Sequence, residues 1–285
     1  MEDLIRDALF SRLFDEAERV RWTMTDVPWQ RIDRAEVTPG LIALVREIAF
    51  SELTTFSATR RFLSEFADDP DLAQWMSVWF YEETKHPQVL LRWLHQVGVS
   101  VDASFILRGR ATAPFMKSRM GTLVTNVISE MVAASNYTAL HRNCREPVLS
   151  LIGRRLAADE ARHAASFYAF ARRWLERSAR PDDDRRDAIK VLYLWFQEGD
   201  LVRHPVNEFH GRQGGRTAGG AGASGQELAD TMGRLGLDLV APRDRIFRLI
   251  GTLTGVPLDG QSDLREVLRR LGGERPAAQK GAGQG

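Results

Sequence analysis

The feature that most constrains this chain is a pair of glutamate and histidine residues that occurs twice. Glu83 and His86 are three residues apart, and so are Glu160 and His163. Residues three apart in an α-helix lie on the same face, so each pair offers a carboxylate and an imidazole to one point. This is the arrangement expected of metal ligands on two separate helices.

A single glutamate precedes each pair by about 30 residues, Glu52 before Glu83 and Glu130 before Glu160. Both upstream glutamates lie in apolar segments, where a lone carboxylate is costly to bury. Such a spacing lets an antiparallel hairpin bring its two acids to the same height, and the longer stretch from 83 to 130 supplies a crossover. The sequence therefore predicts two helical hairpins in tandem.

Apolar residues recur at helical spacing along most of the chain, and the alternation typical of strands is almost absent. We therefore expect an all-α fold, a ferritin-like four-helix bundle with extra N- and C-terminal helices. Prolines, glycines and acidic caps place the helices at about residues 4–20, 39–66, 70–97, 117–143, 147–178 and 181–203, with a looser connection around Gly109 and Pro114.

The chain is expected to form one domain with a flexible insertion. Residues 1–210 form the di-metal bundle, and residues 227–271 form a C-terminal helical extension of the same domain. Residues 211–226 include seven glycines, which predicts a loop between these parts. Residues 272–285 are expected to be a disordered tail.

Charge and cysteine content exclude several classes of protein. The 39 Lys and Arg against 38 Asp and Glu give a net charge of +1, so we expect no nucleic-acid or membrane-surface partner. A single cysteine, Cys144, forms no internal disulfide and fits a reducing compartment. The N-terminus lacks a signal-peptide pattern, and no segment is apolar over the length of a membrane span. We expect a cytoplasmic protein without a membrane span.

Four carboxylates and two imidazoles on four helices match the ligand set of ferritin-like bundles that hold two iron or manganese ions. The alternative is a set of ordinary helix residues paired with Lys85 and Arg162, which explains each residue singly but not the repeated spacing. The predicted metal ligands are Glu52, Glu83, His86, Glu130, Glu160 and His163.

Three neighbours of the predicted ligands are expected to support them. Glu82 and Asp159 each lie four residues before a predicted histidine ligand, and we expect them to accept hydrogen bonds from the imidazoles across the two halves. Trp79 lies one helical turn before Glu83, where it could bind such an acid, carry electrons or simply pack in the core.

Two further sets of residues are candidates for binding. The substrate cavity is expected near the ligands, at Phe56, Thr59, Ala133 and Tyr137, although each of these is also a usual core residue. The stretch from residue 103 to 129 has no acidic residues and four basic ones, which are Arg108, Arg110, Lys117 and Arg119. Its charge predicts a docking surface for an acidic carrier protein or ferredoxin, and the alternative is an ordinary solvated face.

Residues 40–178 resemble the soluble acyl-ACP desaturases, which act on acyl chains held by an acyl carrier protein and belong to the ferritin-like superfamily. The resemblance rests on two segments, Trp75-x3-Trp79-x2-Glu82-Glu83-x2-His86 and Ala158-Asp159-Glu160-x-Arg162-His163. It implies two irons that are reduced by ferredoxin and activate dioxygen, with Glu83 and Glu160 bridging and Glu52 and Glu130 terminal. One departure is Ala133, where plant desaturases have a threonine.

The sequence thus predicts an oxygen-activating non-haem di-iron oxidase or oxygenase, in which manganese replaces one iron as an alternative. Its expected substrate is organic, with an acyl chain as one option, and its expected electron donor is a protein such as ferredoxin. An amine N-oxygenase and a metal-handling ferroxidase are the alternatives, because the ligand set indicates the metal chemistry better than the substrate. Desaturases of this kind pair along a bundle face, which implies a homodimer.

Overall fold

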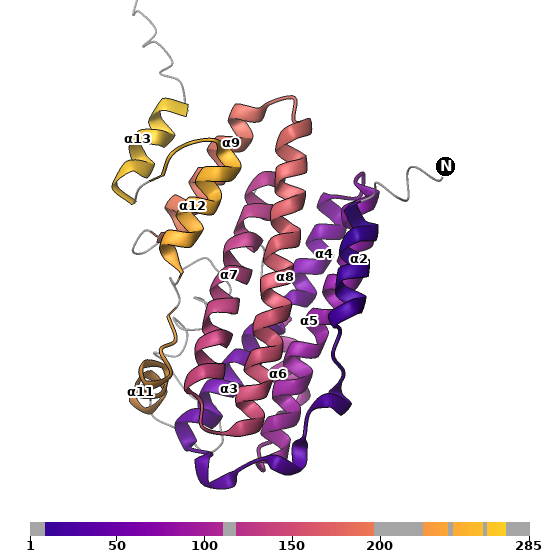
Figure 1. The fold of residues 1–285 in the computed structure, drawn as a ribbon, viewed down its shortest axis with the longest axis vertical. Helices are drawn as coiled ribbons and strands as arrows, with labels where there is room; N and C mark the ends of the chain where they lie inside the picture. Colours follow the sequence, from indigo (N-terminus) through magenta and orange to yellow (C-terminus); the bar gives the residue numbers. More distant parts are fainter. Residues whose placement is uncertain (1–8, 111–117, 197–224, 239–241, 259–260, 272–285) are drawn as a thin grey trace, which may run out of the picture.

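The computed structural model describes residues 9–110, 118–196, 225–238, 242–258 and 261–271, and every regular element within them is a helix. The predicted all-α fold is therefore confirmed. The bundle contains α5 (Pro70–Gln96), α7 (Arg119–Asn143) and α8 (Pro147–Arg177) as continuous helices. Its remaining position is filled by α3 (Pro39–Glu52) and α4 (Thr55–Glu65), which follow one another alongside α5 (Figure 1).

The bundle helices begin at side-chain caps, as the sequence predicts. The hydroxyl of Thr38 accepts a hydrogen bond from the backbone N–H of Leu41 at the start of α3, and Asp69 accepts one from Leu72 at the start of α5. These bonds satisfy N–H groups that have no partner inside the helix. Gly98 follows α5 with φ of +92°, a conformation that suits glycine at a helix end.

The first bundle helix is not continuous from residue 39 to 66, which corrects one expectation. Between α3 and α4 the backbone is tightened by hydrogen bonds that join residues three apart. The N–H of Leu53 donates to the carbonyl oxygen of Phe50 at 3.2 Å, and the N–H of Thr54 donates to the carbonyl oxygen of Ser51 at 3.1 Å. This is 3₁₀ geometry, which interrupts the α-helix without a proline or glycine.

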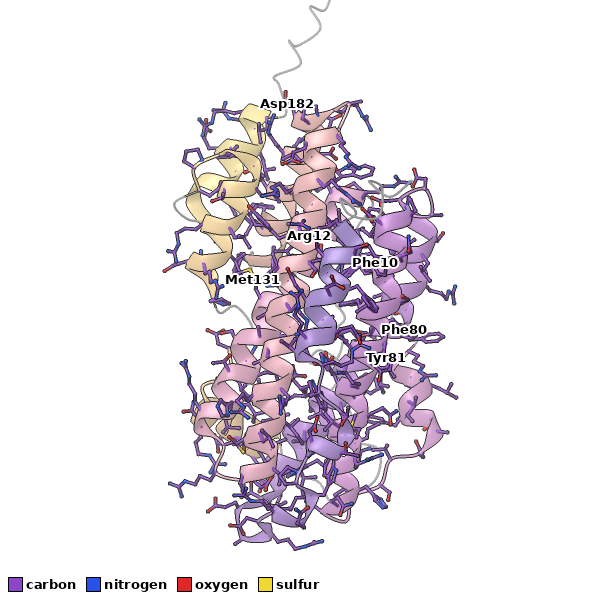
Figure 2. The ribbon with its side chains drawn as sticks, turned by 45° about the vertical axis from the view of Figure 1, so that its right-hand side comes forward. Phe10, Arg12, Phe80, Tyr81, Met131 and Asp182 are labelled. Carbon is purple, nitrogen blue, oxygen red and sulfur yellow. The ribbon has the colours of Figure 1, made fainter. Side chains whose placement is uncertain are left out.

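The outer elements pack around this bundle. Helix α2 (Leu9–Val20) lies along α5 on the outside (Figure 2), and the 3₁₀ turns η1 (Met24–Asp26), η2 (Trp29–Arg31) and η3 (Arg34–Glu36) lead from it to α3. The expected loose connection instead contains α6 (Ala103–Gly109), because Asp102 caps a new helix. Helices α9 (Pro181–Phe196), α12 (Arg243–Thr254) and α13 (Gln261–Leu271) form a group, and α11 (Gly225–Leu235) packs on α3.

Some sequence-based expectations concern residues that the structure does not describe. The described residues do not include the expected helix start at residue 4, Lys117, the end of the helix expected at 181–203, most of the glycine-rich loop or the 272–285 tail. The last residues of the expected loop, Gly225 and Gln226, begin α11 instead. None of the described helices is both long and apolar enough to cross a bilayer.

The apolar interior is divided in two along the bundle. One cluster includes Trp79 of α5 and Phe167 of α8, and the other includes Leu90 of α5 and Leu156 of α8. Between them, from Glu82 to His86 on α5 and at the matching height of the other helices, the buried side chains are mainly carboxylates and imidazoles, together with the ammonium group of Lys85. A polar layer thus lies at mid-height with apolar packing above and below it.

Candidate metal centre

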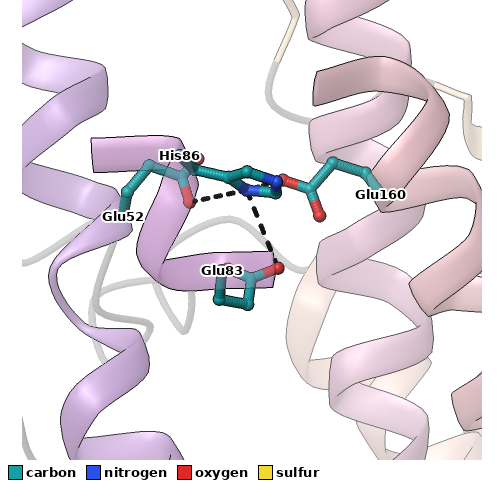
Figure 3. A group of neighbouring side chains, drawn as sticks. All are labelled: Glu52, Glu83, His86 and Glu160. Atoms are coloured by element: carbon teal, nitrogen blue, oxygen red, sulfur yellow. Dashed lines mark ion pairs between the residues drawn. The ribbon is translucent and has the colours of Figure 1, made fainter. Parts of the chain in front are cut away.

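The six predicted ligands come together in this polar layer. One group consists of Glu52, Glu83, His86 and Glu160, with a ligand atom of each within 4.8 Å of the others (Figure 3). A second group consists of Glu83, Glu130, Glu160 and His163 at the same limit. Glu83 and Glu160 belong to both groups, so the structure offers two adjoining positions for metal ions that share these two carboxylates.

Each of the six side chains comes from a bundle helix and points inward. Glu52 is the last residue of α3, and its side chain is 12% exposed, whereas the side chain of His86 is fully buried. Glu130 on α7 and Glu160 on α8 are also buried. Pro87 follows His86 inside α5 and has no N–H to donate, which leaves the carbonyl of Glu83 without its helical partner.

The two imidazoles are held from outside the cluster by Glu82 and Asp159. Nε2 of His163 lies 2.9 Å from Glu82 Oε2, and Nε2 of His86 lies 3.4 Å from Asp159 Oδ2. Each acid thus reaches the histidine of the other hairpin, the arrangement that the sequence predicts. Arg162 joins the two acids, because its Nη2 donates to Glu82 Oε2 at 2.9 Å and to Asp159 Oδ1 at 2.8 Å.

These contacts determine which imidazole nitrogen faces the cluster. Burial raises the pKa of Asp159, but the hydrogen bond from His86 and the charges of both histidines outweigh it and hold that pKa below its usual range. The pKa of Glu82 is lowered against burial by His163 and Arg162. Ionised acids only accept hydrogen bonds, so Nε2 of each ring carries the proton and, in the neutral ring, the Nδ1 lone pair faces the cluster.

Buried atoms without hydrogen-bond partners show that the cluster suits metal ions. Among the described residues, no partner with suitable geometry meets Nδ1 of His86, Nδ1 of His163, Oε1 of Glu83 or Oε2 of Glu160. His163 Nδ1 lies only 2.8 Å from Glu83 Oε1, but this is an ion-pair contact without hydrogen-bond directionality. Unpaired buried polar atoms are costly, and two cations between them would satisfy all four.

The electrostatics of the cluster lead to the same conclusion. Burial and the charge of Glu160 raise the pKa of Glu83 to about 7. Burial, followed by the charges of Glu160 and Glu83, raises the pKa of Glu130 well above its usual range. Three buried carboxylates and the partly buried Glu52 therefore repel each other without metal, and bound dications would remove this penalty.

The alternative of ordinary ion pairing does not match the contacts. The ion pairs of Glu52, Glu83 and Glu160 with other described residues involve only the two histidines. Arg162 pairs with the outer acids instead, and the ammonium of Lys85 donates to the carbonyl oxygen of Trp22 at 3.2 Å. Neither Lys85 nor Arg162, the cationic partners that this alternative names, is paired with a carboxylate of the cluster.

Three more side chains contact the cluster directly. The indole N–H of Trp79 donates to Glu130 Oε1 at 3.2 Å, so the acid that it contacts is a predicted ligand and not Glu82 or Asp159. The hydroxyl of Thr55 donates to Glu83 Oε2 at 3.1 Å. The phenol of Tyr137 donates to Glu52 Oε1. The carboxylates are therefore fixed by donors from α4, α5 and α7.

Sequence reasoning missed Trp22 and the role of Thr55. The indole N–H of Trp22 donates to Asp159 Oδ2 at 2.7 Å, across 137 positions in the chain. Trp22 lies beyond the end of α2, outside any helical pattern, so nothing local predicts this contact. Thr55 is aimed at Glu83 by the 3₁₀ break before α4, which the sequence also did not reveal.

The predicted cavity residues are placed in different surroundings. Thr59 and Tyr137 are buried and Ala133 is half-buried. Phe56 is 41% exposed, with the guanidinium of Arg110 5.0 Å from its ring centre, so it lies at the surface. A cavity lined by these four residues stays a prediction.

The predicted docking residues do not form one uniform basic stripe. Arg119 is paired with Asp68 at 2.8 Å, so its charge is balanced. Arg108 donates to the hydroxyl of Ser104 at 2.7 Å, and Arg110 lies over Phe56. Lys117 lies outside the described residues. Docking of an acidic partner at Arg108 and Arg110 stays a prediction.

Several solved structures have a fold similar to that of this chain. A variant of an R2-like ligand-binding oxidase with an anaerobically reconstituted Mn/Fe cofactor matches with a TM-score of 0.55 and 17% identity, covering 87% of this chain and 92% of that one. The fold is ferritin-like. A variant with an Fe/Fe cofactor matches with a TM-score of 0.52, 16% identity and the same coverage. No model of a protein family matches the sequence.

The comparison supports the predicted ferritin-like fold but not the resemblance to acyl-ACP desaturases. These similar structures are oxidases named for ligand binding and for Mn/Fe or Fe/Fe cofactors. At such low identity the likeness establishes the fold alone. The repeated carboxylate and histidine pattern is shared across ferritin-like bundles, so it predicts the ligand set and not the subfamily.

Removing the charge of an outer acid should weaken metal binding. Asp159→Asn keeps the shape of the side chain but takes the carboxylate from His86, and we expect metal affinity to fall by about 10- to 100-fold. Asp183→Asn, at an exposed position of α9, is the matched control and should bind metal like the wild type. Competition with a coloured chelator measures both affinities; equal affinities would show that Asp159 does not support a ligand.

Metal binding should tighten as the pH rises. Burial disfavours protonation of His86, but the charges of Glu83 and Glu160 outweigh it and raise its pKa well above the usual value; the pKa of His163 is also raised. Both imidazoles therefore carry an extra proton below these raised values, which a metal ion must displace. Affinity measured from pH 6 to 8 should rise, with protons released into weak buffer. An affinity independent of pH would contradict histidine ligation.

Proposed function

We propose that this protein is an oxygen-dependent oxidase with a cofactor of two metal ions, either two irons or one manganese and one iron, that acts on an organic substrate. The proposal rests on one observation: two groups of buried ligands share Glu83 and Glu160. The ferritin-like fold agrees with it, and the R2-like oxidases of similar fold carry cofactors of these compositions.

The ligand set favours metals that use oxygen-rich coordination. Carboxylates with one imidazole at each position suit iron and manganese, whereas zinc and copper favour more nitrogen or sulfur. Glu52, Glu83, Glu160 and His86 would hold one ion, and Glu83, Glu160, Glu130 and His163 the other. When bound, the metals supply the redox chemistry needed to reduce dioxygen.

The protein's own residues prepare the site for this chemistry. Glu82 and Asp159 keep the proton on Nε2 of the two imidazoles and present Nδ1 inward. Trp79, Thr55 and Tyr137 each donate a hydrogen bond to a carboxylate of the cluster, which orients the acids before metal binds. Such preorganisation lowers the reorganisation needed during reaction.

Aromatic and apolar side chains surround most of the site and limit its contact with water. Trp79 packs against Phe62 and Phe167, with ring centres 5.6 and 5.5 Å apart, directly above the cluster. The second apolar cluster closes the site from below. A dry site strengthens electrostatic interactions and protects reactive species from side reactions.

The proposed substrate, electron donor and oligomeric state are those that the sequence predicts. We propose an organic substrate over iron storage, because the chain continues past α8 into helices that pack on the bundle. An acyl chain, an electron donor such as ferredoxin and a homodimeric state complete the proposal. Sedimentation of the metal-loaded protein tests the dimer: a single species of twice the chain mass is expected, and a monomer contradicts it.

Oxygen uptake by the metal-loaded protein tests the function. The protein is loaded with Fe²⁺, or with Mn²⁺ and Fe²⁺, reduced without air and then exposed to oxygen together with fatty acids, acyl carrier protein carrying an acyl chain, or aromatic amines. We expect oxygen uptake and mass changes in one substrate class, either loss of two hydrogen atoms or gain of oxygen. Mass change in the amines alone would favour N-oxygenation over acyl chemistry.

Two outcomes would count against an oxidase. Protein that contains two metal ions but takes up no oxygen would contradict the proposal. Continued turnover of added Fe²⁺ with no change in any organic compound would indicate a ferroxidase instead. His163→Ala, which removes one ligand of the second group, should abolish uptake, and His95→Ala, outside the cluster on the same helix as His86, should leave it unchanged.

A further inference from the structure

An open cavity lies on the outer side of the network that holds the imidazoles. It is about 460 Å³ in volume and is formed by the end of α2, the residues just after it and the middle of α8. Asp159, Arg162 and Trp22 are among its lining residues. This volume falls within the range of small-molecule sites, about 300–1,000 Å³.

The charges that line the cavity favour an anion. Three guanidinium groups, of Arg19, Arg155 and Arg162, face two carboxylates, of Glu16 and Asp159. Asp159 cannot serve as a free acceptor for a cation, because Oδ1 accepts from Arg162 and Oδ2 accepts from Trp22 at 2.7 Å. The acid at the base of the cavity is therefore already neutralised by its partners.

Two of the three arginines are available to a ligand. Arg162 is occupied by Glu82 and Asp159. Arg19 is exposed and Arg155 is half-buried, and within the described part of the chain the ion pairs of this region are formed by Arg21 and Arg162 and not by these two arginines. Guanidinium groups bind carboxylates through two parallel hydrogen bonds, which makes them well suited to recognise an organic acid.

Apolar groups line the same cavity. Trp22, Val20 and Ala158 contribute to its wall, and Val20 is 54% exposed. A ligand with only charge would leave these groups in contact with water. The cavity thus combines cationic and apolar surface, which fits a carboxylate with a short hydrocarbon or aromatic part.

We propose that this cavity is a binding site for a small organic carboxylate, with Arg155 and Arg19 as its anion-binding residues and Trp22 as its apolar wall. The site is distinct from the metal cluster, because Asp159 and His86 stand between them. It also goes beyond the proposed oxidase function, since binding there requires no oxygen chemistry. Its occupant would lie against the same acid and guanidinium that hold His86.

Binding of phenylacetate to the full-length, metal-loaded protein tests the proposal, with calorimetry and saturation-transfer NMR as readouts. We expect one site per chain. Phenylacetamide has the same shape without the charge, and its affinity should be lower by a factor of about ten or more. An equal concentration of inorganic phosphate should leave phenylacetate binding essentially unchanged, because phosphate has no apolar part.

Paired arginine variants locate the site. Arg155→Gln and Arg19→Gln should each weaken phenylacetate binding by about tenfold. Arg154→Gln is the matched control: it removes the same charge from the neighbouring, exposed position of α8, outside the cavity lining, and should bind like the wild type. Metal content should be the same in all three variants, which separates this test from that of the oxidase function.

Several results would overturn the proposal. These are no phenylacetate binding, equal binding of the amide, full displacement by phosphate, or equal affinity in the Arg155→Gln and Arg154→Gln variants. Displacement by phosphate would show that the cavity responds to charge alone. Equal affinity in the two variants would place binding elsewhere on the molecule.

Discussion

Glu160→Ala is expected to remove both metal ions from the protein. Glu160 belongs to both ligand groups, and its carboxylate is buried where no other described acid can replace it. The wild-type protein should hold about two ions per chain, and the variant should hold almost none after gel filtration. Elemental analysis by mass spectrometry measures the content directly. The variant should still fold, because the substitution removes the charge of Glu160 that raises the pKa values of the buried acids Glu83 and Glu130.

Variants at other acids sharpen this test. Glu52 belongs only to the first group and Glu130 only to the second, so each single alanine variant should lose chiefly one ion. Glu176→Ala, at a position 64% exposed on the same helix as Glu160, should keep the wild-type content. A Glu160→Ala protein that retains two ions per chain would contradict the shared role of this carboxylate.

Glu146→Ala is expected to cause the largest loss of stability away from the cluster. The side chain is fully buried and accepts four hydrogen bonds at the start of α8. The donors are the indole of Trp93 at 2.8 Å and the backbone N–H groups of Asp33, Val148 and Leu149 at 3.2, 3.1 and 2.7 Å. Alanine leaves all four unpaired, so the free energy of unfolding should fall by about 3–5 kcal/mol.

Urea denaturation of the metal-free proteins measures this loss, and metal content is determined separately. Glu176→Ala again serves as the control, since its contact with Arg172, 3.5 Å away, is exposed and should contribute less than about 1 kcal/mol. A Glu146→Ala protein as stable as this control would show that the buried hydrogen bonds do not join the N-terminal segment, α5 and α8 in the folded state.

The ligand cluster could be predicted from the sequence because its residues are marked by patterns within single helices. Glu83 and His86 share a helical face by spacing alone, and a carboxylate in an apolar helix such as Glu130 signals a buried role. The same logic placed Glu82 and Asp159 beside the histidines of the opposite hairpin. Helix limits were also local, since proline and capping residues mark most of them.

Features that depend on the packing of distant segments could not be predicted from local sequence patterns. The break after Glu52 keeps right-handed helical dihedrals at Leu53 and Thr54 (φ of −65° and −64°), so no residue type there signals it. Trp22 reaches Asp159, and Tyr137 reaches Glu52, only because distant helices pack together. The subfamily could not be predicted for a related reason: cavity walls differ among bundles that keep the same ligands.

The two-metal centre is tested most directly by a crystal structure of the iron-loaded protein with anomalous diffraction recorded at the iron absorption edge. We expect two separate anomalous peaks in the polar layer between the two apolar clusters. One should contact Glu52 and His86, the other Glu130 and His163, and both should contact Glu83 and Glu160. A single peak, or peaks that avoid Glu83 and Glu160, would contradict the two-metal centre.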